Sequence, residues 1–78
     1  MAAVQAGARR YTVLLTPDDG GYMVTVPALA GCFTQGATVE QALERAREAI
    51  RVHIAGLEAD GEPVPEESER PRLEFVEV

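Results

Sequence analysis

The chain has 78 residues, of which 46% are hydrophobic and 26% charged, and its formal net charge is −6. This length accommodates one domain, and the composition is typical of a folded globular protein. Nucleic-acid phosphates repel an acidic domain, so we expect no direct nucleic-acid binding. A basic protein partner would instead be attracted.

The sequence favours a cytoplasmic protein. Cys32 is the only cysteine, which excludes an internal disulfide framework and fits a reducing compartment. Residues 1–10 lack the pattern of a secretory signal, and no apolar run approaches the roughly 20 residues of a membrane span, so no membrane association is expected. We expect residues 1–8 to be disordered within a single domain spanning residues 1–78.

Three short strands are predicted ahead of residue 38. Residues 9–16 alternate with the period of two that a strand requires, and so does Tyr22–Val26. Pro17–Gly21 contains Pro, Asp and Gly, the residues typical of a turn, and it would join the two runs as a β-hairpin. After a bend that follows Pro27, Cys32–Gln35 is predicted as the third strand.

One long amphipathic helix is predicted from Thr38 to about Asp60. Thr38 and Gln41 form a T-x-x-Q capping box, and Gly61 can supply the left-handed residue that ends the helix. The residues expected to form its buried face recur every three or four positions. They are Val39, Ala42, Leu43, Ala46, Ile50, His53, Ile54 and Leu57.

Residues 73–78 are rich in Val, Phe and Leu and are predicted as a fourth strand, after a polar loop. The predicted fold is therefore α+β with the order β-β-β-α-β, one helix packed on a small mixed sheet, and the helix longer than the strands. The other face of the sheet would carry Leu14 and Met23 with no cover. This open face suggests an oligomer interface.

Several spaced segments resemble the HicB-like antitoxin family over roughly residues 10–65. They are Tyr11–Val13, Pro17–Tyr22, Val26–Cys32, Thr34–Thr38 leading into an Ala-rich helix, and Gly61–Pro65. The resemblance implies a truncated ribonuclease-H-like fold with the fourth strand beside the first. It also implies an antitoxin that masks the active site of a small basic HicA-type toxin, an mRNA-cleaving protein with a double-stranded-RNA-binding-like fold.

Longer members of that family carry a C-terminal DNA-binding domain. Too few residues follow Gly61 in this sequence to form one, so we expect none here. The resemblance leaves two functions open. The chain could neutralise a toxin, or it could be an orphan module without a toxin that assembles into a homodimer or homotetramer.

An enzyme is the third hypothesis, a vestigial nuclease using Asp18 and Asp19. Ribonuclease-H-type chemistry needs several carboxylates that converge on two metal ions, and the predicted strands supply no others. An Asp before Gly is typical of a turn. We therefore predict that Asp18 and Asp19 are turn residues that can also contact a partner, and that they do not form a metal site.

No other group is predicted to be catalytic or to bind a cofactor. His53 is the only histidine, so a site with several histidines is excluded, and we interpret it as a half-buried packing residue, with a pH-sensitive contact as the alternative. Cys32 has no nearby predicted base and is interpreted as a small buried hydrophobe. The chain has no Lys and no phosphate-binding loop.

Partner contacts are predicted at two acidic places. The first is the hairpin tip, with Asp18, Asp19 and Tyr22. The second follows the helix, where Glu58, Asp60 and Glu62 begin an acidic tract that continues with Glu66, Glu67 and Glu69. Such a tract could be simply solvated, or it could steer a basic toxin.

Overall fold

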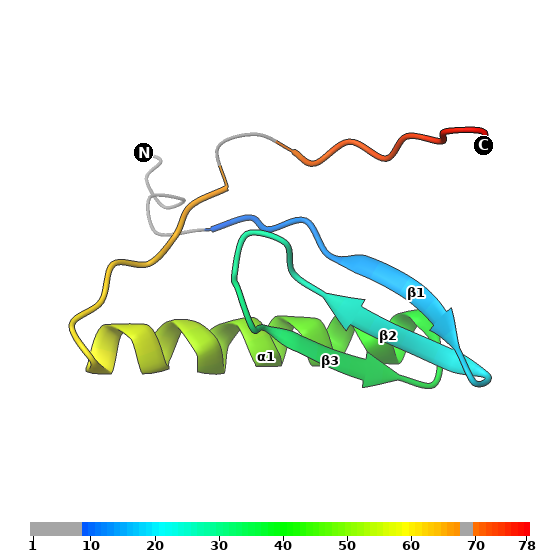
Figure 1. Cartoon of the computed structure of the whole chain (residues 1–78). Coiled ribbons are helices and arrows are strands. Elements are labelled where there is room, and N and C mark those ends of the chain that lie inside the picture. Colours follow the sequence, from blue (N-terminus) through cyan, green and yellow to red (C-terminus); the bar gives the residue numbers. More distant parts are fainter. Residues whose placement is uncertain (1–8, 68–69) are drawn as a thin grey trace, which may run out of the picture.

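The computed structural model describes residues 9–67 and 70–78. Three strands, β1 (Leu14–Asp18), β2 (Gly21–Thr25) and β3 (Phe33–Gly36), precede one helix, α1 (Val39–Ala59). The strands form an antiparallel sheet in the order β1-β2-β3, and α1 covers one face of it (Figure 1). The predicted α+β class is confirmed.

The β1–β2 hairpin turns through only two residues, Asp19 and Gly20. Both have positive φ, 52° and 84°, which matches the twist of the strands they connect. The prediction of a five-residue turn was too long, because this pair is sufficient. β1 is therefore displaced from the predicted 9–16 to residues 14–18 and includes Pro17, which is tolerated on an edge strand.

A tight connection between β2 and β3 forms part of the core. The Val26 N–H donates to the Cys32 carbonyl at 3.2 Å, and the Cys32 N–H donates to the Leu29 carbonyl at 3.0 Å. Val26, Leu29 and Cys32 are buried together. The interpretation of Cys32 as a buried hydrophobe is confirmed, and burial raises the pKa of its thiol, which disfavours the nucleophilic thiolate.

Close contact between α1 and the sheet forms the rest of the core. Ala42 and Ala46 of α1 are buried against Val24 in the middle strand. Gly36 allows this close approach, because a Cβ at this position would lie only 2.6 Å from the Ala42 backbone nitrogen. Only residues without bulk at these positions allow the helix axis to come this near.

Both ends of α1 are capped as predicted. The Gln41 N–H donates to Thr38 Oγ1 at 3.0 Å, and the Gln41 side chain accepts from the Ala37 N–H at 2.7 Å, one residue before the cap. At the other end Gly61 has a φ of 71°, and the Glu62 N–H donates to the Leu57 carbonyl at 2.9 Å. This is a Schellman motif, which satisfies carbonyls that the helix leaves unpaired.

The buried face of α1 is narrower than predicted. Val39 is 46% exposed and Leu43 is 42% exposed. The helix contacts the sheet along the row of Ala42 and Ala46, so these two larger side chains fall to one side. The second half of α1 extends past the sheet (Figure 1), and His53 there is half-buried, as predicted.

The fourth strand predicted at residues 73–78 is wrong for this structure. The segment is extended but forms no strand, and Phe75 is fully exposed. Glu67 accepts a hydrogen bond from the Thr12 N–H, and residues 70–78 diverge from β1 (Figure 1). A strand exists only with a pairing partner, and the described residues offer none beside this segment. The ribonuclease-H-like arrangement that needs this strand is not confirmed.

We predict that Gly36→Ala will lower the free energy of unfolding by about 1–3 kcal/mol, because the new methyl group collides with the α1 backbone. Urea denaturation followed by circular dichroism measures this. Gly56→Ala is the matched control. A Cβ at Gly56 meets nothing within 4 Å, so this helix substitution should stabilise by about 0.5–1 kcal/mol. Equal effects of the two variants would contradict the close approach.

Candidate partner-binding surfaces

The hairpin tip borders a shallow hollow of about 390 Å³. Asp18 and Asp19 lie on its hairpin side, together with Tyr22. Gln35 and Arg45 lie on its other side, where the Arg45 guanidinium donates to the Gln35 carbonyl at 3.4 Å. The three predicted contact residues of the tip are therefore neighbours. They face a surface on which charged and amide groups of β3 and α1 are also accessible.

The two aspartates do not form the core of a metal site in the described structure. Both are exposed, and Asp19 is the first of the two central residues of the tight turn, as its positive φ shows. Among residues 9–67 and 70–78, no three His, Cys, Asp or Glu side chains are placed to share a metal ion.

Within the same described residues, α1 is the one long helix, and it is too polar to span a membrane.

The post-helix acidic residues lie at the opposite end of α1. Glu58 is in its last turn, Asp60 is its C-cap, and Glu62 follows directly. A helix of this length separates its two ends by about 30 Å. The structure therefore does not bring the two predicted contact sites together, and they are two separate surfaces. Glu69, also predicted for this tract, lies outside the described residues.

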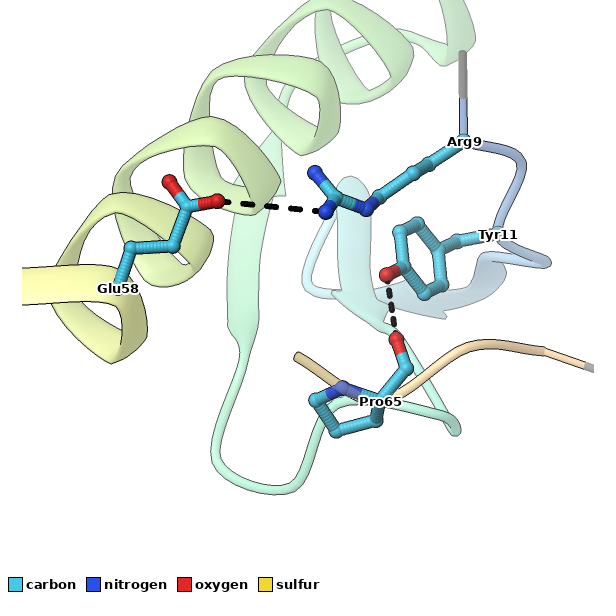
Figure 2. A network of polar contacts seen from close by, with 4 residues as sticks. All are labelled: Arg9, Tyr11, Glu58 and Pro65. Carbon is cyan, nitrogen blue, oxygen red and sulfur yellow. Dashed lines mark hydrogen bonds and ion pairs between the residues drawn. The ribbon is translucent and has the colours of Figure 1, made fainter. Parts of the chain in front are cut away.

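A polar network ties the residues before β1 to the last turn of α1 and to the segment after it (Figure 2). The Tyr11 hydroxyl donates to the Pro65 carbonyl at 2.6 Å. Arg9 lies 4.0 Å from the Glu58 carboxylate, and both side chains are exposed, so this ion pair contributes little stability. Sequence reasoning missed this network, because nothing local predicts contacts between residues more than 45 positions apart.

Glu67 is held by a second, tighter contact next to this network. Its carboxylate accepts from the Thr12 N–H at 2.7 Å and from the Thr12 hydroxyl at 2.6 Å. These hydrogen bonds favour the charged form and lower the pKa of Glu67, with nearby Arg70 adding to the effect. Partial desolvation opposes them but does not prevail. The Thr12–Glu67 contact joins the residues just before β1 to the segment that follows α1.

An apolar groove of about 690 Å³ lies between α1 and the residues before β1. Its apolar lining includes Tyr11 and Val13 on one wall and Leu43, Ile50 and Ile54 on the other. Four of the seven basic residues border it: Arg9, Arg10, Arg47 and Arg51. Sequence reasoning missed this groove. The available signal was the spacing of Arg47 and Arg51, one helical turn apart and beside the apolar positions.

This geometry defines a small two-layer α+β domain with several accessible charged surfaces. The chain belongs to a family described as the HicB-like antitoxins of bacterial toxin–antitoxin systems, whose family model matches residues 11–74. The resemblance seen in the sequence is thereby confirmed.

Individual relatives agree with this assignment. A UPF0150 protein of Thermoplasma acidophilum is 50% identical over 60 residues, which cover 76% of this chain and 87% of that protein. A UPF0150 protein of Synechocystis is 48% identical over 58 residues, 73% of each chain. The antitoxin HicB of Escherichia coli K12 is 40% identical over 57 residues, 72% of this chain but 41% of that protein.

We predict that the Glu67 carboxyl will titrate below the ordinary glutamate value of about 4.3. The Thr12 contact then contributes stability at neutral pH, and this contribution is lost as the pH falls through the lowered pKa of the folded state. Carboxyl-carbon NMR over pH 2–7 measures it. Thr12→Val removes the hydroxyl donor and should return the pKa toward the ordinary value. An unchanged midpoint in that variant would contradict the contact.

Proposed function

We propose that this chain is an antitoxin that neutralises a small basic, mRNA-cleaving toxin of the HicA type by covering its active surface. Membership of the HicB-like antitoxin family over residues 11–74 carries this proposal. The relatives named antitoxin HicB, which match 72% of this chain, support the antitoxin role. The identity of the toxin partner and the masking of its active surface go beyond family membership and are proposed here.

The charge of the chain supports a basic partner. Its net charge of −6 attracts a basic protein and raises the encounter rate. Exposed carboxylates at the hairpin tip, Asp18 and Asp19, and after the helix, Asp60 and Glu62, are the contacts we propose, with Tyr22 and Glu58 beside them. In this proposal the chain binds in the cytoplasm as a single domain, without catalysis, a cofactor or direct contact to nucleic acid.

The open face of the sheet favours a second candidate, an orphan module that assembles with itself. Met23 is 38% exposed and Phe33 is 59% exposed, and the strand register places both on the face opposite α1 together with Leu14. Exposed apolar side chains that are grouped on one face are typical of an interface. In this alternative the product is a homodimer or homotetramer without a toxin.

The two functions separate in a capture experiment from native cells. Tagged chain is isolated at about 50 mM salt and again at about 500 mM salt, and the bound proteins are identified by mass spectrometry. We expect a small basic protein at low salt that is largely released at high salt, since salt screens exposed charges. Capture of the chain alone, from cells that encode a toxin beside its gene, would contradict the antitoxin proposal.

For the post-helix contact, we predict that the pair Asp60→Asn and Glu62→Gln will weaken binding of the captured toxin about 3- to 30-fold, mainly through slower association. Surface plasmon resonance at low salt measures the rates. The pair Glu44→Gln and Glu48→Gln removes the same charge from the exposed side of α1 and should have a smaller effect. Equal losses would show that net charge alone attracts the toxin.

A further inference from the structure

Two exposed parts of this molecule are complementary in their apolar character and their charge. One is the arginine-bordered groove between α1 and residues 9–13. The other is the segment Leu73–Val78, which is extended and exposed along its whole length. We propose that the groove binds the Leu73–Val78 segment of a second copy of this chain, and that the reciprocal exchange forms a two-fold symmetric dimer.

The segment has the composition of a bound strand-like peptide. Leu73 is 79% exposed and Phe75 is fully exposed, and Val76 and Val78 are also in solvent. Fully burying each such side chain is worth about 1.5–3 kcal/mol. Monomeric proteins rarely leave four large apolar residues exposed in one short segment, so a partner surface accounts for them.

The groove matches the segment in length and in apolar character. Its helical wall runs from Leu43 to Ile54, which is about 17 Å at the rise of an α-helix. Six extended residues span about 20 Å. The walls offer Leu43, which is 42% exposed, and the partly buried Ile50 and Tyr11 as contacts for Phe75 and its neighbours.

The charges of the two parts are opposite. The segment carries Glu74 and Glu77 between its apolar residues, whereas four arginines border the groove. Glu74 pairs with Arg72 at 2.8 Å, but both side chains are exposed, so this pair contributes little and can be exchanged for a groove arginine. Within the described part of the chain, Arg10, Arg47 and Arg51 form no ion pair with any carboxylate. In an otherwise acidic chain, this concentration of positive charge selects an acidic apolar segment.

The fold directs the segment to another copy and not to its own groove. Tyr11 and Thr12 hold Pro65 and Glu67 by hydrogen bonds, and residues 70–78 lie on the side of residues 9–13 away from α1 (Figure 1). In Figure 1 residues 9–13 and β1 together lie between α1 and the segment of residues 70–78. The segment is thus separated from its own groove by the wall of that groove, while a symmetric pair satisfies both grooves.

The test is the oligomeric state of the purified chain and its variants, by sedimentation equilibrium from 1 to 200 µM. The full chain should be a dimer. A chain ending at Arg72 and the variant Phe75→Asp should each raise the dimer dissociation constant about tenfold or more. Phe33→Asp, the matched control on the open sheet face, should leave it unchanged.

A charge exchange makes the test specific for this groove. Arg47→Glu with Arg51→Glu should dissociate the dimer, and adding Glu74→Arg with Glu77→Arg to the same chain should restore it, which also shows that the variants fold. A monomeric full chain at 200 µM would overturn the proposal. So would a dimer that survives the loss of residues 73–78 or is broken by Phe33→Asp. No toxin is present, so the result is independent of the proposed antitoxin function.

Discussion

The near contact between α1 and the middle of the sheet is the constraint on which the other features depend. Gly36, Ala42 and Ala46 have so little bulk that the helix lies almost against the strand backbone, with Val24 filling the remaining space. A chain this short buries only a modest fraction of its surface, so a few tightly packed residues must supply most of its core. The large side chains of α1 that flank this contact, Leu43 among them, remain partly accessible.

That accessibility links packing to the proposed functions. The helix sits on small residues and extends past the sheet, so its apolar positions on the β1 side form a groove instead of a sealed core. The open face of the sheet has a similar origin, because one helix can cover only one face. The domain thus folds with two apolar surfaces that remain available, while its carboxylates are displayed at the hairpin tip and beyond the helix.

Contacts between the two ends of the sequence decide how these surfaces are used. Hydrogen bonds join Tyr11 and Thr12 to residues 65 and 67, and residues 70–78 do not line the groove. Membership of the HicB-like antitoxin family over residues 11–74 supports the proposed antitoxin role. Self-association through the groove and toxin binding through the carboxylates use different residues in these proposals, although Glu58 lies beside the groove residue Arg9.

Local chemistry was sufficient to predict the hairpin, the helix with both caps, and the burial of Cys32. Each depends on residues within a few positions: Asp19 with Gly20, Thr38 with Gln41, and Gly61 after Leu57. The resemblance to the HicB-like family also came from short spaced motifs. Hydrophobic spacing overestimated the buried face of α1, because periodicity does not show where on that face the sheet will lie.

Three features were determined only by the tertiary structure. They are the absence of strand pairing at residues 73–78, the groove, and the separation of the two acidic sites. A run of Leu, Phe and Val has the propensity for a strand, but propensity supplies no hydrogen-bonding partner, and the described chain leaves this segment without one. The groove requires residues 9–13 and α1 to meet across 30 or more positions of sequence. Contacts between residues so far apart in the sequence depend on packing and on long-range hydrogen bonds, and no local sequence pattern identifies the partners.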